Sequence, residues 1–324
     1  MDERLKLNKI IGHTKQVDFL NELLNTKKIH HAWIFSGPSG VGKSLFAEYF
    51  ATLLIDKNIS KNLVGRWESD PNGVTQKRIF EKTHPDYFFI KKELSSFSKN
   101  NQLRNKKQTN IPIDLLREFV IGGTCSDGVF YNPPLGRSPT IGNSKVFVIN
   151  EADLIREDGQ NALLKSLEEP PPKTYLILIA PQPQKLLPTI HSRCQTVRFG
   201  TLSGEEMASW LNHSWPNRCI DEDDWILRFS DGCPGKANLA LKMELPPFIK
   251  SIENELLVNT GTTTGVGVSE KISSFIDNWG KLVQKENKEA SKEVATREAS
   301  SMVFEALGVL MRENLLVDKN KTNA

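Results

Sequence analysis

A glycine-rich segment near the start of the chain has the residue types needed to bind phosphate. Residues 37–44 spell Gly-Pro-Ser-Gly-Val-Gly-Lys-Ser, the G-x-x-x-x-G-K-S pattern of a P-loop. An apolar run at 32–35 precedes this pattern, and a helical pattern at 45–50 follows it. In this context the backbone N–H groups of the turn converge on phosphate oxygens at the positive end of the helix. The segment therefore predicts nucleotide binding.

Five residues of the P-loop have predicted roles. Gly37, Gly40 and Gly42 would let the backbone approach the phosphates, and Lys43 would lie between the β- and γ-phosphates. The hydroxyl of Ser44 would bind Mg²⁺. A loop that keeps its glycines but holds no nucleotide is the alternative. Binding and hydrolysis are separate predictions.

Hydrolysis requires a second, acidic element at the end of a neighbouring buried strand. The apolar run 146–149 is followed by Asn150 and Glu151, where the usual pattern has Asp-Glu. Glu151 is predicted to orient the attacking water. Asn150 offers an amide oxygen without negative charge, so we expect weaker Mg²⁺ binding and slower turnover. Asp153 either compensates for the lost charge or only begins a helix.

Alternating strand and helix patterns must position these residues. Strands are predicted at 86–90, 145–149 and 174–179, and helices at 113–121 and 159–167. This alternation indicates an α/β fold with a parallel sheet covered on both faces.

Beyond residue 200 the strand signal fades and helical patterns dominate. We predict a P-loop nucleotide-binding domain at 1–200, a small helical lid at 201–244 and a C-terminal helical domain at 245–324. Residues 91–110 are polar and basic, which predicts an exposed loop that either contacts DNA or is simply solvated.

Composition narrows the class of protein. The 324 residues carry a net charge of only +3, without the basic excess of an autonomous DNA binder. Apolar runs are too short to cross a membrane, and the N-terminus has no signal-peptide core, so we expect a cytoplasmic protein. The four cysteines have no C-x-x-C spacing and are expected to be reduced thiols.

Four ordered segments support a family resemblance. Residues 161–171 are similar to the N-A-L-L-K-x-L-E-E-P-P stretch of bacterial clamp-loader subunits, and 186–194 are similar to their S-R-C motif. With Thr-His-Pro-Asp-Tyr at 83–87 and the residues 31–38, the chain resembles the delta-prime type of DNA polymerase III clamp-loader subunit. The resemblance covers about residues 8 to 200 and is weak beyond about 245.

The resemblance implies an AAA+ fold with a helical lid and a C-terminal collar for oligomerisation. It implies that Arg193 is an arginine finger, reaching the nucleotide of a neighbouring subunit. A guanidinium is always charged and presents fork-shaped donors to a phosphate. Lys236 stands where relatives carry a basic residue that contacts phosphate from the lid. The alternatives are a local carboxylate partner for Arg193 and a plain surface position for Lys236.

Two departures from the family pattern bear on function. Residues 51–83 contain no cysteine, so the zinc module of many relatives is lost or metal-free, and we expect no zinc. The strand-end sensor position, usually Thr, Ser or Asn, falls at Ala180 and Pro181. Together with Asn150, this predicts a poor ATPase.

The leading interpretation is a delta-prime-like subunit that helps load the sliding clamp onto primer-template DNA during replication. Its partners would be the gamma/tau and delta subunits and the clamp. It would bind ATP and Mg²⁺ with little hydrolysis, and it has no visible polymerase site. The alternative within the family is an active gamma/tau-type ATPase motor. A third possibility is an unrelated P-loop protein, such as a nucleotide kinase or a helicase loader.

Overall fold

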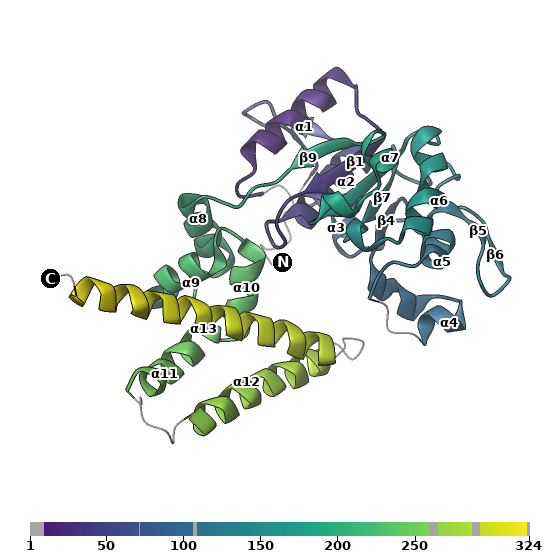
Figure 1. Ribbon diagram of the computed structural model, residues 1–324. Coiled ribbons are helices and arrows are strands. Elements are labelled where there is room, and N and C mark those ends of the chain that lie inside the picture. The colour runs from purple at the N-terminus through teal and green to yellow at the C-terminus, as the bar shows by residue number, and fades with distance from the viewer. Residues whose placement is uncertain (1–9, 71, 106–108, 259–264, 287–291, 323–324) are drawn as a thin grey trace. The chain divides into compact units, whose positions relative to one another are not determined.

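The computed structural model describes residues 10–70, 72–105, 109–258, 265–286 and 292–322. The chain divides into two compact units, Met1–Ser214 and Trp215–Ala324 (Figure 1). The finer division into three domains stays a prediction. No helix in the described ranges is long and apolar enough to cross a membrane.

A five-stranded parallel sheet organises the first unit. Its strands in spatial order are β4 (Tyr87–Ile90), β7 (Lys145–Ile149), β8 (Thr174–Ala180), β1 (Ala32–Ser36) and β9 (Gln195–Arg198). β8 is inserted between β1 and β7. The carboxyl ends of all three strands therefore meet at one edge of the sheet, where ligands bind in open α/β sheets.

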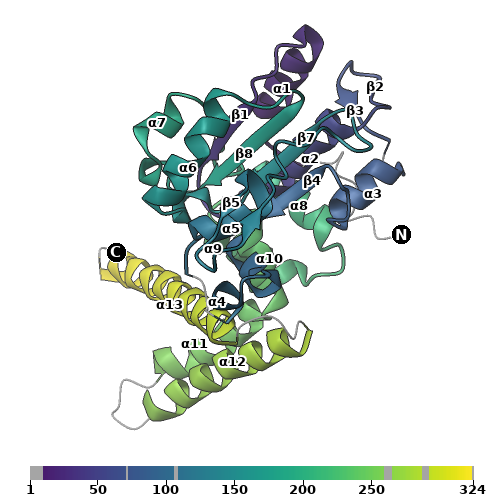
Figure 2. The same cartoon turned by 90° about the vertical axis from the view of Figure 1, so that its right-hand side faces the viewer.

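Helices cover both faces of this sheet (Figure 2). One layer contains α1 (Thr14–Thr26), α2 (Lys43–Ile55) and α3 (Val74–Phe80), and the other contains α5 (Ile113–Leu116), α6 (Glu157–Glu168) and α7 (Pro188–His191). Strands that are buried on both faces are continuous apolar runs, and every residue of β1 and β7 is buried. The predicted α/β class is confirmed.

The predicted elements match the observed ones closely, with two informative differences. β4 begins at Tyr87 and not at residue 86, and the carboxylate of Asp86 just before it accepts N–H bonds from Thr140, Ile141 and Gly142. The predicted helix at 113–121 is α5 followed by a π-helical turn, η3 (Arg117–Ile121).

The basic segment 91–110 is only partly the exposed loop that its composition predicts. It contains the 3₁₀ turn η2 (Lys92–Phe97) and the short helix α4 (Asn101–Arg104), and residues 106–108 lie outside the described ranges. Ser98 and Asn100 are buried, and the carboxylate of Glu118 accepts from the Ser98 hydroxyl and the Lys99 N–H. These contacts hold the segment against η3.

A short hairpin follows η3 and consists of β5 (Gly123–Thr124) and β6 (Phe130–Tyr131). Between β7 and α6 lies the 3₁₀ turn η4 (Ala152–Leu154), and between β8 and α7 lies η5 (Pro183–Lys185). Helix α8 (Gly204–Ser214) completes the first unit.

The cysteine-free stretch 51–83 forms a small hairpin of β2 (Ser60–Lys61) and β3 (Trp67–Glu68), followed by α3. Trp67 fastens the hairpin to α1. Its backbone N–H donates to the Asn21 Oδ1 atom at 2.6 Å, and its indole N–H donates to the Asn25 Oδ1 atom at 3.0 Å.

The second unit is helical. It contains η6 (Ile220–Glu222), α9 (Asp223–Ser230), α10 (Pro234–Lys242), α11 (Leu245–Val258), α12 (Gly265–Glu286) and α13 (Lys292–Thr322). Apolar residues from α9, α10, α11 and α13 form its own core, centred on Phe229, Ile249 and Val303.

Candidate functional site

The P-loop connects β1 to α2 and is held in a conformation that only glycine adopts easily. Gly37, Gly40 and Gly42 have φ angles of 137°, 82° and 104°. A Cβ atom added to Gly37 would lie 2.1 Å from the carbonyl oxygen of Phe199, just after β9. Any side chain at this position would push the loop away from β9.

Lys43 lies at the first position of α2 and is only 5% exposed. Its Nζ atom donates to the carbonyl oxygens of Gly37 at 2.7 Å and Pro38 at 2.5 Å. The lysine side chain therefore folds back and binds the first two residues of its own loop. His13, the residue just before α1, supports the loop, because its Nε2 atom lies 2.7 Å from the carbonyl oxygen of Val41.

Ser44 and Asn150 meet across the sheet edge, although they are far apart in sequence. The Ser44 hydroxyl donates to the Asn150 Oδ1 atom at 3.0 Å. Ser44 belongs to α2, and Asn150 directly follows β7. β8 lies between β7 and β1 in the sheet, so the end of β7 is one strand away from the strand that leads into the P-loop. The structure thus pairs the predicted Mg²⁺-binding hydroxyl with a neutral amide.

Glu151 follows Asn150 and adopts a left-handed backbone conformation, with φ of 53°. Its carboxylate forms an ion pair with Lys92 from η2, with 2.8 Å between Oε2 and Nζ. The Glu151 side chain is 36% exposed and that of Lys92 is 25% exposed. The predicted water-orienting carboxylate is therefore already engaged by a cation from the basic segment.

Asp153 lies in η4, two residues further along. Its Oδ1 atom is buried and has no hydrogen-bond partner among the described residues. Burial raises the pKa of Asp153 above its ordinary value, and the nearby charge of Glu151 raises it further. Compensation for Asn150 by this carboxyl group stays a prediction.

The sensor position at the end of β8 carries no hydrogen-bonding side chain. Ala180 is the last residue of the strand and is fully buried, and Pro181 follows it. This strand end lies between those of β1 and β7, beside the P-loop.

Arg193 follows α7, and its side chain is 33% exposed. Its Nη2 atom lies 2.6 Å from the Oε1 atom of Glu168, the last residue of α6. The next residue, Cys194, packs against the apolar core below the sheet, and burial raises the pKa of its thiol to about 12. The cysteine anchors the turn, while the arginine remains at the surface.

Lys236 belongs to the second unit, in the first turn of α10. Its Nζ atom lies 2.6 Å from the Oε1 atom of Glu305 on α13 and 4.3 Å from the ring centroid of Phe229. It is therefore more than a plain surface lysine. A role in contacting phosphate stays a prediction.

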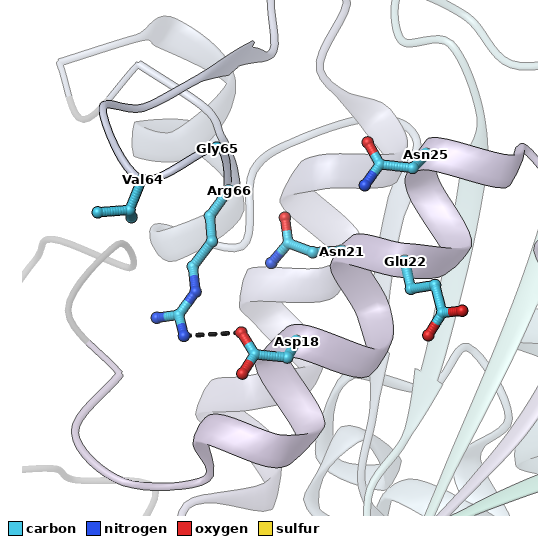
Figure 3. A pocket seen from close by; sticks show the side chains of 7 residues that line it. All are labelled: Asp18, Asn21, Glu22, Asn25, Val64, Gly65 and Arg66. Atoms are coloured by element: carbon cyan, nitrogen blue, oxygen red, sulfur yellow. Dashed lines mark ion pairs between the residues drawn. The ribbon is translucent and has the colours of Figure 1, made fainter.

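A separate open pocket of about 490 Å³ lies between α1 and the tip of the β2–β3 hairpin (Figure 3). Inside it, Arg66 points toward Asp18, and their charged atoms are 2.7 Å apart. The pocket contains none of the predicted nucleotide-binding residues. It is not the site suggested by the motifs.

The structure brings Lys43, Ser44, Asn150 and Glu151 together at one sheet edge. Three contacts of the site were missed from the sequence: His13 with the Val41 carbonyl of the P-loop, Lys92 with Glu151, and Glu305 with Lys236. The contact of Glu168 with Arg193 is the local carboxylate partner that the sequence offered as an alternative. Lys92 and Glu168 both lie in segments that the sequence singles out, the basic stretch and the L-E-E-P run. Their pairing depends on contacts between distant segments.

Known proteins resemble the part of the chain that builds this site. The family described as "DNA polymerase III, delta subunit" matches residues 12–119 and 132–203, more than half of the chain. The chain belongs to this family. The unmatched residues 120–131 include both strands of the β5–β6 hairpin.

Individual relatives cover much of the chain at moderate identity. DNA polymerase III subunit delta' of Pseudomonas aeruginosa is 29% identical over 205 residues, covering 63% of this chain and 53% of its own length. DNA polymerase III subunit gamma of Buchnera aphidicola subsp. Schizaphis graminum is 28% identical over 269 residues, covering 83% and 65%. The chain thus spans between about half and two thirds of these two curated relatives.

Among solved structures, a DNA polymerase III gamma subunit-related protein from Thermotoga maritima aligns with a TM-score of 0.39 and 16% identity. The alignment covers 91% of this chain and 97% of that one.

Proposed function

We propose that this chain is a delta-prime-type subunit of a clamp loader, which binds nucleotide but hydrolyses it poorly. The observation that carries the proposal is the hydrogen bond from Ser44 to Asn150. It places an uncharged amide beside the hydroxyl expected to bind Mg²⁺, where an active P-loop ATPase has a carboxylate.

The residues present fit the phosphates of a nucleotide. Gly37, Gly40 and Gly42 have positive φ angles, which favour glycine, so these three positions carry no side chain that could block a phosphate. Helix α2 begins directly after the loop, and its N-terminus favours a bound anion. Lys43 would exchange its bonds to the loop carbonyls for phosphate oxygens, and Ser44 would bind Mg²⁺. Bound ATP would supply the γ-phosphate on which hydrolysis depends.

Three features of the site argue against efficient hydrolysis. Asn150 lacks the charge that would hold Mg²⁺ firmly, and Ala180 offers no hydrogen bond to a γ-phosphate. Glu151 is paired with Lys92 at 2.8 Å, so its carboxylate must leave this cation before it can orient water. Each feature removes or blocks one contact that stabilises the transition state.

The main contribution of the subunit would then be made in a neighbour's site. Arg193 would act as an arginine finger on the nucleotide of an adjacent gamma/tau-type subunit. Delta, the sliding clamp and primer-template DNA would be the other partners, and the complex would work in the cytoplasm. The collar role of the C-terminal helices is part of the same proposal. The subunit would need no zinc, which metal analysis of the purified chain can check.

Reconstitution of a clamp loader with gamma/tau, delta and this chain tests the finger. We expect Arg193→Ala to lower DNA-stimulated ATP hydrolysis of the complex by about 10³-fold or more at each site the finger serves. Nucleotide binding by the isolated chain should stay unchanged. Arg198→Ala, at an exposed arginine that ends β9, is the matched control. Equal turnover of the Arg193 and Arg198 variants would refute the finger assignment.

The alternative is an active gamma/tau-type motor. The complete P-loop and the presence of Glu151 favour this reading, as does the match to a gamma subunit over 83% of the chain. Turnover by the purified chain separates the two proposals. Robust hydrolysis that disappears in Lys43→Ala would overturn the weak-ATPase proposal.

A further inference from the structure

The ion pair between Arg193 and Glu168 joins the S-R-C motif to the L-E-E-P run. Glu168 Oε1 lies 2.6 Å from Arg193 Nη2. On the other side of the guanidinium, Nη1 donates to the Thr189 carbonyl at 3.0 Å and to the Ser192 hydroxyl at 3.2 Å. Both terminal nitrogens of the guanidinium are therefore bound within this chain.

The backbones that carry this pair are held in place independently of it. Buried Gln160 on α6 donates to the Lys185 carbonyl and accepts from the Leu187 N–H, just before α7. At the other end of α6, the His31 Nε2 atom lies 2.8 Å from the Leu167 carbonyl oxygen. Loss of the Glu168 carboxylate would therefore release the Nη2 atom of Arg193 without releasing α6 or α7, while Nη1 keeps its bonds to Thr189 and Ser192.

Glu168 does not serve the stability of its own helix. It is the last residue of α6, where the negative end of the helix dipole disfavours a carboxylate. The neighbouring Glu169 has no ion pair in the described part of the chain. Arg193 is thus the feature that gives the charge of Glu168 a local partner.

We infer that Glu168 is a positioning residue that holds Arg193 at rest and competes with a neighbour's phosphate for it. This inference rests on the proposed finger role. A phosphate accepts the same fork of N–H donors that a carboxylate accepts, so the two groups are alternative acceptors. Arg193 engages the neighbour only when a phosphate there replaces Glu168.

The strength of the pair suits such an exchange. The side chains are 33% and 49% exposed, and exposed ion pairs are weak. Removal of the competing carboxylate should therefore raise the apparent affinity of the complex for ATP by no more than about fivefold. The maximal rate should not change, because the saturated state has Arg193 on phosphate in both proteins.

The test uses the reconstituted complex and compares Glu168→Gln with the matched control Glu169→Gln. We expect Glu168→Gln to lower the ATP concentration for half-maximal turnover by about two- to fivefold, at unchanged maximal rate. Glu168→Lys should shift it in the same direction and should not destabilise the chain, because a cation suits a helix C-terminus. Neither Glu168 variant should have an effect in an Arg193→Ala background.

The outcomes distinguish this inference from the proposed function. An unchanged half-maximal concentration in Glu168→Gln, or a shift that Glu169→Gln reproduces, would overturn the role of Glu168 alone. A loss of maximal rate would also overturn it, since Glu168 would then support the engaged arginine. If Arg193→Ala leaves turnover intact, the finger itself is refuted and the role of Glu168 falls with it.

Discussion

At the scale of single residues, the predicted nucleotide site combines all the P-loop residues expected to hold phosphate with an uncharged residue at the position expected to support Mg²⁺. The glycines, Lys43 and Ser44 follow the P-loop pattern, while Asn150 replaces a charged group by an amide of nearly the same shape. Asn150 can still accept the Ser44 hydroxyl at 3.0 Å, so the geometry survives and only the charge is missing. The site therefore offers a direct test of what that charge contributes.

We predict that Asn150→Asp strengthens Mg²⁺-dependent ATP binding by about three- to tenfold, since a charged acceptor forms stronger bonds than a neutral one. Turnover should rise only modestly, because Ala180 and the pairing of Glu151 with Lys92 remain. ATP affinity measured with Mg²⁺ and with a chelator checks this expectation. Asn161→Asp, on the exposed side of α6, is the control. The prediction is contradicted if the ratio of the ATP affinity with Mg²⁺ to the ATP affinity with a chelator is the same in Asn150→Asp and in the parent chain.

At the scale of elements, the Thr-His-Pro-Asp-Tyr turn shows how one motif fastens two segments. Asp86 is fully buried just before β4, and it accepts the N–H groups of Thr140, Ile141 and Gly142 at 2.6 to 2.9 Å. Burial alone would raise the pKa of Asp86, but these three bonds outweigh it and lower the pKa below its ordinary value. In His84, by contrast, burial itself lowers the pKa, because it disfavours the charged imidazolium.

We predict that Asp86→Asn destabilises the fold by about 2 to 4 kcal/mol at neutral pH, because an amide nitrogen would face backbone donors. The contribution of Asp86 is complete above the ordinary aspartate pKa of about 4 and is lost as pH falls through its lower folded value. Denaturant unfolding across pH therefore should show the two proteins converging in acid.

Asp127→Asn is the control, because the Asp127 carboxylate accepts the Val129 N–H at an exposed turn. It should cost much less. A stability difference between Asp86→Asn and the parent that persists unchanged below about pH 3 would contradict the assigned linkage. Buried His84 adds a loss of the same sign, beginning as pH falls below about 6.5.

At the scale of the whole molecule, each of the two units contains a hydrophobic core cluster of its own. The core beneath the sheet is built from residues between Ala32 and Cys194, and the helical core from residues between Trp225 and Leu310. No residue is shared between these two clusters. A unit with its own core can in principle fold alone.

We predict that a fragment ending at Ser214 folds cooperatively and still binds nucleotide, with an affinity below that of the full chain only by the contact predicted for Lys236, which lies beyond the fragment. Its sheet, P-loop and Asn150 all lie before that residue. Circular dichroism during denaturation and a nucleotide titration measure both properties. A fragment that unfolds without a cooperative transition would show that the second unit is required for the first.

The P-loop, the buried strands and the uncharged residue at position 150 could all be predicted from the sequence. These features depend on residue type and on spacing along the chain, which periodicity and local backbone preferences translate directly into structure. The predicted strands at 145–149 and 174–179 accordingly coincide with β7 and β8 to within one residue. The helix predicted at 113–121 widened into a π-turn, a deviation that local pattern does not encode.

Which charged groups form pairs depends on how distant segments of the chain pack together. Lys92 and Glu151 are 59 positions apart, and Lys236 and Glu305 are 69 apart. Arg193 meets Glu168 because α6 and α7 lie together on one face of the sheet. Such pairs depend on strand order and helix packing. The sequence contains several carboxylates, and residue type alone does not indicate which of them pairs with a given lysine or arginine. The candidate site residues could therefore be predicted from the sequence, whereas their ion-pair partners follow from the fold.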